Sequence, residues 1–298
     1  MRLTKPCVTW WPQRNTMEHI AKVGRICYKS EGKQPPKDAD ENERAAFIRA
    51  RDDERCKAFW KSGHRSMFRH GTAYFYARND RSFPSFLWSF LSASPFIDYV
   101  SKGHKVWIST NMQYLFEHEA LKETLEPYGV SEGEFIELTL KQDFFEPLRL
   151  LRMTFVVKTQ ISTSRELNRT SPNSIAEQST RYCNFQKAGG VQIAQPCWYE
   201  GGSWWQRFLF RFPCQVADWA YRLLLRSGLK PQDARGVLPL DTYTMVAYTY
   251  SIEEWKAIID LRYRGTTGTP HPNAKLVVGE IRACINRRLK EIHTNLTI

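Results

Sequence analysis

The sequence predicts an α+β fold, because segments with helical periodicity and segments with strand-like alternation are mixed without a regular strand–helix–strand rhythm. Two segments carry this prediction. Apolar residues alternate through "RLLRMTFVVKTQIS" (149–162), as in a half-buried strand. The segment "WWQRFLFRFPCQVADWAYRLLLRSG" (204–228) has the spacing of a helix. At 298 residues the chain is long enough for one large domain or two small ones.

In chain order, a first helix is predicted from Thr16, its N-cap, to about Tyr28. The polar, proline-containing stretch 31–43 indicates a surface loop, and a second helix is expected over about 43–61. Residues 63–78 then pass from a loop into an alternating strand. The apolar face of the first helix would carry Ile20, Val23 and Cys27.

In the middle of the chain, residues 103–118 are expected to form a strand and then a helix, followed by the strand within 149–162. A second short strand is expected in "GGVQIAQP" (189–196). Gly228 suits the C-cap of the helix that precedes it.

Helices are predicted for most of the remaining chain. Pro231 can start a new helix, and a break at Pro239 separates it from further helices as far as residue 264. The segment "GEIRACINRRLKEI" (279–292) predicts a final amphipathic helix.

The formal net charge of +12 and the pI near 9.4 favour an anionic partner, either a nucleic acid or small phosphate-bearing ligands. Because the basic residues are spread along the chain, the pattern argues against a nucleic acid. No apolar run approaches the roughly 20 residues of a membrane span, and the N-terminus lacks a signal-peptide core, so we expect a cytoplasmic protein that does not enter a membrane. The seven cysteines form no CxxC pair, which indicates reduced thiols and no zinc or other metal site.

The stretch "SRELNRTSPNSIAEQSTRYCN" (164–184) is dense in hydrogen-bond donors. Arg169 and Arg181 are separated by serine and threonine residues, and arginine forks with hydroxyl groups suit a phosphate. Glu177 within such a site could accept from a ribose hydroxyl or hold an arginine. There is no P-loop or dinucleotide fingerprint. The alternative, a helix cap with surface ion pairs, stays open on these residues alone.

Arg235 in "ARGVLP" and Arg262 in "DLRYR" follow further along the chain. In this order and spacing, the three pieces resemble the flavin-dependent thymidylate synthases. The signature of that family is Arg-His-Arg, seven residues, Ser, and then Arg-Tyr. The matching residues here are Arg169, Thr170 and Ser171, then Ser179, then Arg181 and Tyr182.

The resemblance implies one domain over residues 1–298, a mixed or antiparallel sheet flanked by helices, and an enlarged insertion at about 82–146. It also implies a homotetramer with active sites between subunits. The implied reaction is methylation of dUMP at C5, with FAD as cofactor and with NADPH and methylenetetrahydrofolate as co-substrates.

Site residues follow from the same resemblance. Arg262 would be catalytic, because a fixed positive charge at the pyrimidine edge stabilises electron density that builds on the base. Arg235 would be contributed from another subunit. The implied dUMP-binding residues are Glu166, Arg169, Glu177, Gln178, Ser179, Arg181, Arg235 and Arg262. The implied FAD-binding residues are His64, Ser66, Arg69, Arg169, Thr170, Ser171, Ser174 and Ser251.

The sequence departs from the family pattern on the flavin side, where Thr170 and Ser171 replace His and Arg, and Arg69 replaces Glu. The nucleotide-side residues are all present. Three readings therefore remain: a divergent FAD-dependent dUMP methylase; a related C5 methylase or hydroxymethylase acting on dUMP, dCMP or UMP; or a non-catalytic protein on this fold that binds nucleotides or nucleic acid.

Overall fold

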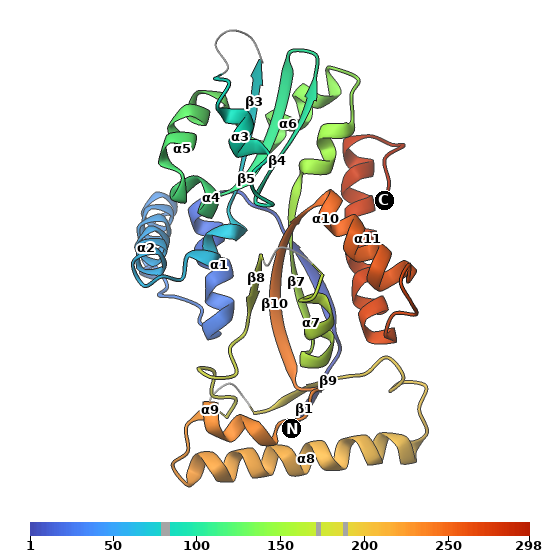
Figure 1. The fold of residues 1–298 in the computed structure, drawn as a ribbon. Coiled ribbons are helices and arrows are strands. Elements are labelled where there is room, and N and C mark those ends of the chain that lie inside the picture. The colour runs from blue at the N-terminus through green and yellow to red at the C-terminus, as the bar shows by residue number, and fades with distance from the viewer. Residues whose placement is uncertain (79–83, 171–173, 187–189) are drawn as a thin grey trace.

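The computed structural model describes residues 1–78, 84–170, 174–186 and 190–298. Its centre is a four-stranded sheet whose neighbouring strands all run antiparallel (Figure 1). In spatial order the strands are β2 (Cys7–Trp11), β7 (Arg152–Gln160), β10 (Tyr243–Ser251) and β8 (Ile175–Glu177). An antiparallel sheet flanked by helices confirms the predicted α+β fold, and β7 confirms the strand expected within 149–162.

Strand β10 shows that the prediction of helices within residues 231–264 was wrong for residues 243–251, whereas residues 231–234 and 252–259 are helical as expected. Its sequence, "YTMVAYTYS", is rich in the β-branched and aromatic residues that favour strands. Both of its faces are buried: Val246 and Tyr248 belong to one apolar cluster of the core, and Ala247 belongs to another. Because both faces carry apolar residues, the period-two alternation disappears, and the run cannot be distinguished from a buried helix by its pattern.

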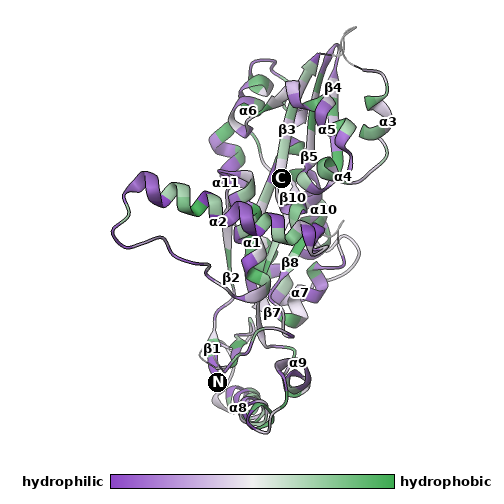
Figure 2. Cartoon of the chain, turned by 90° about the vertical axis from the view of Figure 1, so that its left-hand side faces the viewer, coloured by the Kyte–Doolittle hydropathy of each residue, from purple (hydrophilic) through white to green (hydrophobic). Residues whose placement is uncertain are grey.

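Two helices cover one face of the sheet. Ile20 and Val23 on the inner face of the first pack against Val156 of β7 and Ala247 of β10. The second helix packs along the first, and its N-terminal end projects with the polar loop before it (Figure 2). These helices are α1 (Thr16–Tyr28) and α2 (Glu41–Lys61).

The bounds of α1 agree with the prediction, but the predicted N-cap does not. Asn15 is the N-cap: its side chain accepts the Glu18 N–H at 3.0 Å, and its backbone is extended. Thr16 is already inside the first helical turn. Asparagine is among the preferred N-cap residues, so the cap lies one residue earlier than expected.

The opposite face of the sheet is covered by α7, α10 and α11. Trp255 of α10 is fully buried against Phe155 and Tyr250, with ring centroids 5.2 and 5.0 Å away. The predicted C-terminal helix is present but begins earlier, at Pro272. The elements are α7 (Ile161–Leu167), α10 (Ile252–Ile259), the π-helical segment η5 (Asp260–Arg264) and α11 (Pro272–Ile292).

A second four-stranded antiparallel sheet is built from residues 72–130. It has an apolar core of its own, in which Val106, Ile108 and Leu121 are fully buried. The strand and helix expected within 103–118 are confirmed as β5 and α4. The strands are β4 (Ile97–Lys102), β5 (Lys105–Asn111), β3 (Thr72–Arg78) and β6 (Gly129–Val130). The helices around them are η1 (Arg65–His70), α3 (Leu87–Leu91), α4 (Met112–Glu117), α5 (Glu119–Leu125), η2 (Glu126–Tyr128), α6 (Glu132–Leu140) and η3 (Glu146–Leu150).

One end of the molecule, here called the base, consists of β1 (Arg2–Thr4), β9 (Gln192–Ala194), α8 (Trp204–Arg226), α9 (Pro231–Ala234) and η4 (Arg235–Val237). Strands β1 and β9 pair in parallel, and α8 lies across the end of the molecule (Figure 1). Helix α8 confirms the helix predicted over 204–228. Gly228 follows it with φ +96°, the left-handed conformation that favours glycine after a helix.

Candidate functional site

The donor-rich stretch forms α7, then β8, and then a turn over residues 178–182. Strand β8 lies at the edge of the central sheet, with Glu177 opposite Val246 of β10. Helix α7 packs beside β7 and β10. This arrangement brings the start of the stretch and Glu177 together, although they are more than ten residues apart.

Glu177 is held by three donors. Its carboxylate accepts from Ser164 Oγ at 2.8 Å and Thr244 Oγ1 at 3.0 Å, and from Asn168 Nδ2 at 3.3 Å. The amide oxygen of Asn168 in turn accepts from the buried Tyr248 hydroxyl at 2.8 Å. The half-buried carboxylate is therefore a fixed acceptor with a defined orientation.

The sequence analysis missed these partners of Glu177. Ser164 and Asn168 are four residues apart on α7, so their spacing could have indicated a shared helical face. No such spacing indicated Thr244, because the sequence analysis predicted a helix for the segment that forms β10.

The turn after β8 is fixed by its backbone. The Gln178 N–H donates to Met245 O at 2.8 Å, and the Ser179 N–H donates to Cys27 O at the end of α1 at 2.9 Å. The Ser179 hydroxyl oxygen then accepts the backbone N–H groups of Arg181 and Tyr182, at 3.1 and 3.4 Å. Ser179 thus shapes the turn that presents Arg181.

Arg181 and Arg235 lie at the same turn, with both side chains exposed. Arg235 Nη1 donates to Thr180 Oγ1 at 2.6 Å, within one chain. Among the described residues, neither guanidinium forms an ion pair with a carboxylate. Two exposed guanidinium groups, one carried by the turn and one bonded to it, can bind a phosphate through charge-assisted hydrogen bonds.

A hollow of about 850 Å³ adjoins the turn. The rings of Tyr28 and Tyr182 lie 5.7 Å apart at its wall. Lys29 has a left-handed backbone, with φ 49°, which is uncommon for a residue other than glycine. The sequence analysis did not identify Tyr28 or Lys29. Other lining residues are Trp11, Lys22, Arg25, Cys183, Asn184 and Met245.

Three predicted nucleotide-side residues lie apart from this turn. Glu166 is half-buried on α7, and Arg169 is exposed beyond the end of α7. Arg262 lies in η5, and its Nε is buried without a hydrogen-bond partner in the described part of the chain. No hydrogen bond or ion pair between described residues joins these three side chains to Glu177 or to the turn.

The predicted flavin-side residues lie toward the other end of β10. Arg69 Nε donates to Gln113 Oε1 at 2.7 Å, and the guanidinium lies 4.6 Å from the ring centre of Phe96. Partial burial lowers the pKa of Arg69. Ser251 is the N-cap of α10, where its hydroxyl accepts the Glu254 N–H at 3.1 Å.

The remaining flavin-side residues are mostly engaged or buried. The Thr170 hydroxyl donates to Leu167 O at 2.5 Å, Ser174 is 2% exposed, and Ser66 is half-buried. His64 is exposed, with Nδ1 2.9 Å from the Ser62 hydroxyl. Ser171 lies outside the described residues.

These residues therefore do not form a complete flavin site within one chain. The Thr170 hydroxyl donates its proton to Leu167 O, and the Arg69 guanidinium is held by Gln113 and Phe96. The Ser251 hydroxyl accepts the Glu254 N–H and keeps its own proton to donate. Of the predicted flavin-side residues that the structure describes, His64 and Arg169 have exposed side chains.

A buried polar chain lies between α1, η1 and the central sheet. His19 Nε2 is 2.9 Å from Thr154 Oγ1, which is 2.7 Å from Thr249 Oγ1, and that hydroxyl is 2.8 Å from His70 Nδ1. Burial is the main cause that lowers the pKa of His19 to about 4 and that of His70 to about 3. Both imidazoles are therefore neutral at physiological pH.

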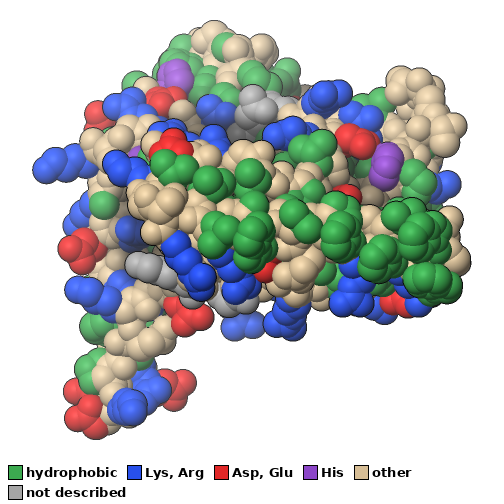
Figure 3. Space-filling view, turned by 90° about the horizontal axis from the view of Figure 1, so that it is seen from below, with side chains coloured by type: hydrophobic (Ala, Val, Ile, Leu, Met, Phe, Trp, Pro, Cys, Tyr) green, Lys and Arg blue, Asp and Glu red, His purple; other side chains and the backbone are tan. Residues whose placement is uncertain are grey.

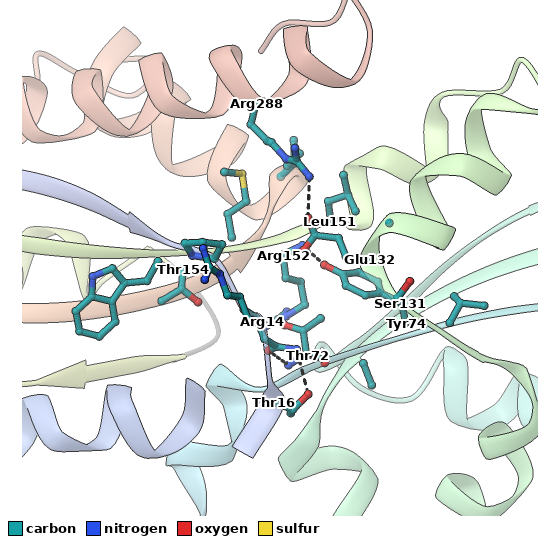
Figure 4. Close-up of a pocket in the computed structure, with 18 of the residues that line it drawn as sticks. Arg14, Thr16, Thr72, Tyr74, Ser131, Glu132, Leu151, Arg152, Thr154 and Arg288 are labelled. Atoms are coloured by element: carbon teal, nitrogen blue, oxygen red, sulfur yellow. Dashed lines mark hydrogen bonds and ion pairs between the residues drawn. The ribbon is translucent and has the colours of Figure 1, made fainter. Parts of the chain in front are cut away.

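A second cavity, of about 530 Å³, lies where the two sheets meet (Figure 4). At one end Arg288 pairs with Glu132 at 3.2 Å, and Arg14, Thr72 and Thr16 lie toward the other. None of the predicted site residues lines this cavity. It is distinct from the turn that carries Arg181.

Comparison with protein families matched residues 97–294 to the Thy1 model, described as thymidylate synthase complementing protein. All the predicted nucleotide-side residues lie within this match, whereas His64, Ser66 and Arg69 precede it. No curated protein sequence matched the chain.

Two solved structures of one enzyme are among the structural matches. One is a UMP/dUMP methylase, PolB from Streptomyces cacaoi, bound with 5-Br UMP; it is 24% identical, with a TM-score of 0.42, over 53% of this chain and 79% of that chain. The other is the same methylase bound with 5-Br dUMP, 21% identical, with a TM-score of 0.40, over 57% of this chain and 80% of that chain.

Proposed function

Because the chain belongs to the Thy1 family of thymidylate synthase complementing proteins, and is a methyltransferase of that family, we propose that it methylates C5 of a pyrimidine nucleotide. The substrate proposed first is dUMP. The observation that carries the nucleotide-binding part of this proposal is the pair of exposed arginines, Arg181 and Arg235, at the turn behind Glu177. A nucleotide monophosphate supplies the dianion that two guanidinium groups bind well.

In this proposal Arg181 and Arg235 of the same chain bind the phosphate, whereas the family resemblance implied Arg235 from another subunit. The backbone of the turn is held by Met245 O and Cys27 O, so little conformational freedom is lost when the phosphate binds. The Glu177 carboxylate, already oriented by three donors, accepts from a hydroxyl of the sugar. Gln178 and Ser179 contribute through the shape of the turn.

Arg262 is proposed to stabilise negative charge that develops on the base as C5 attacks the one-carbon unit. The buried guanidinium Nε, which has no partner among the described residues, supports this role, because such a donor is costly unless a ligand or another chain supplies an acceptor. Glu166 and Arg169 are proposed to contact the nucleotide from α7 and the segment that follows it.

The cofactor remains a separate prediction. The family resemblance implies FAD, reduced by NADPH, with methylenetetrahydrofolate as carbon donor, whereas the flavin-side residues do not form a flavin site in one chain. The implied homotetramer, with active sites between subunits, would supply further donors from a second chain. An absorbance spectrum from 300 to 550 nm, recorded with added FAD, tests this prediction: saturable flavin binding supports it, and no binding at high FAD contradicts it.

The altered flavin-side residues favour one alternative, in which the protein binds a pyrimidine nucleotide but performs a different C5 modification, or none. Product mass distinguishes a methyl from a hydroxymethyl group. The deciding experiment incubates the protein with FAD, NADPH, methylenetetrahydrofolate and, separately, dUMP, UMP and dCMP, and identifies products by mass spectrometry. A methylated nucleotide supports the proposal. Nucleotide binding by calorimetry with no product overturns the methylation step but leaves the nucleotide site intact.

A further inference from the structure

Helix α8 has an apolar outer face that the protein leaves uncovered. Trp204 is 75% exposed, Phe212 59% and Trp219 61%, values unusual for large apolar side chains. Figure 3 views the molecule from the base and shows an apolar row across its width. The row consists of Trp204, Trp205, Phe208, Leu209, Phe212, Val216, Trp219 and Leu223.

These side chains form one stripe along the whole helix. They recur at spacings close to the 3.6 residues of a helical turn, over 23 residues, or about 34 Å at 1.5 Å per residue. Their rings contact one another: Trp205 stacks on Phe208 at 5.5 Å, and Phe208 on Phe212 at 5.7 Å. The stripe is therefore continuous.

The stripe is not needed to attach α8 to the molecule. The inner face of the helix carries Phe210, Cys214 and Tyr221, which pack in the apolar core of the base with Val191 and Ile193. A helix needs one apolar face to pack against its protein. The second apolar face of α8 is thus available for a partner.

The charges of α8 identify the kind of partner. The helix carries Arg207, Arg211, Arg222 and Arg226. Arg207 donates to the carbonyls of Tyr199 and Glu200, whereas Arg211 and Arg226 have no hydrogen-bond or ion-pair partner in the described part of the chain. Its one acidic residue, Asp218, is buried and paired with Arg222 at 3.0 Å, so α8 presents no exposed carboxylate. Two α8 helices in contact would bring positive charges together without an exposed carboxylate on either helix to pair with them. An anionic surface complements them.

We propose that α8 lies flat on an anionic lipid surface, with its Trp, Phe and Leu side chains among the headgroups and its arginines at the phosphates. Tryptophan and arginine on one amphipathic helix are typical of this location. The helix would bind the surface without crossing it: in the described ranges, no helix has the length and apolar character to cross a membrane. This proposal is independent of the proposed reaction.

Flotation with vesicles of phosphatidylcholine, with and without phosphatidylglycerol, tests the proposal on the full chain. We expect binding to the phosphatidylglycerol vesicles, weakened by salt, and little binding to neutral ones. Combining Trp205→Ser, Phe208→Ser and Phe212→Ser should reduce binding about tenfold or more. The matched control is Leu276→Ser, which removes an exposed apolar side chain of α11 and should leave binding unchanged.

A second variant keeps the test valid if the triple variant misfolds. Arg211→Glu with Arg226→Glu leaves the aromatic stripe intact and should remove the preference for phosphatidylglycerol. Absence of binding to both vesicles, or equal binding to both, overturns the proposal. A third outcome also overturns it: the wild type is an oligomer that binds no lipid, and the triple variant is a smaller species. The stripe would then be a contact between copies of the chain.

Discussion

Arg181 lies in the turn itself and Arg235 reaches it from a later segment of the chain, and the position of each depends on a polar contact. Arg181 follows from the Ser179 turn, and Arg235 is held by Thr180. The spacing of the signature predicted Arg181 and Ser179 directly. The contact between Arg235 and Thr180 within one chain could not be predicted from the sequence, because it depends on how the fold places the base beside β8.

The first prediction concerns this pair. Arg181→Ala and Arg235→Ala should each weaken dUMP binding roughly tenfold to hundredfold, since a charge-assisted hydrogen bond contributes about 1.5–3 kcal/mol. Isothermal titration calorimetry measures the change. Arg287→Ala, which removes an exposed arginine on α11, should bind dUMP as the wild type does. Unchanged affinity in both site variants would exclude this turn as the phosphate site.

A second prediction concerns His19 and His70. In the folded protein their pKa values, about 4 and about 3, lie below the ordinary histidine value of 6.5, so between these values the unfolded chain binds more protons than the folded one. Their contribution to stability is complete above pH 6.5 and decreases as the pH falls. At pH 5 the free energy of unfolding of the protein should be lower by about 2 kcal/mol for each of the two histidines.

Urea unfolding at pH 7 and pH 5 measures this loss. His19→Gln should lower stability at pH 7 and reduce the further loss on acidification by about half. An equal pH dependence in wild type and His19→Gln would show that His19 is not the titrating group.

At the scale of elements, α8 contains a proline in its interior. Pro213 is exposed and lacks the N–H that would donate to the carbonyl of Leu209. Pro213→Ala should therefore raise the free energy of unfolding by about 1–3 kcal/mol. Thermal unfolding by circular dichroism measures the shift, and Gln215→Ala, at an exposed position of the same helix, should change stability by no more than about 0.5 kcal/mol. A lower melting temperature for Pro213→Ala would mean that the inner packing of Phe210 and Cys214 requires the proline geometry.

Local pattern predicted α1, β7 and α8 well, because the apolar residues of the two helices recur at helical spacing and β7 keeps polar Thr154 and Lys158 among its apolar residues. It failed for β10, whose two buried faces removed the alternation. The residues of the candidate site were likewise predicted only in part. Spacing in the sequence located Glu177, Ser179 and Arg181, which are close together in the chain. Partners from distant elements, such as Thr244 and Lys29, depend on tertiary packing and gave no local signal.

At the scale of the whole molecule, we predict that the chain assembles into a homotetramer. A homotetramer should give a mass near four times the 34.9 kDa of the chain in light scattering. The physical reason is that a flavin site, if present, must be completed by another chain. The α8 triple variant described above should retain the tetramer, because that face is assigned to lipid. A monomeric mass measured with FAD bound would contradict the predicted tetramer. It would also contradict the conclusion that one chain alone lacks a complete flavin site.

The bond from Arg235 to Thr180 has a thermodynamic consequence. Arg235 belongs to the base, whereas Thr180 lies in the turn that follows β8, the edge strand of the central sheet. A phosphate bound by Arg181 and Arg235 would act as a clasp between these two parts, so nucleotide binding and closure of the clasp are linked equilibria. Backbone amides of residues 231–237 should then exchange with deuterium more slowly when dUMP is bound. The free energy of dUMP binding would include the free energy of holding the base against the central sheet.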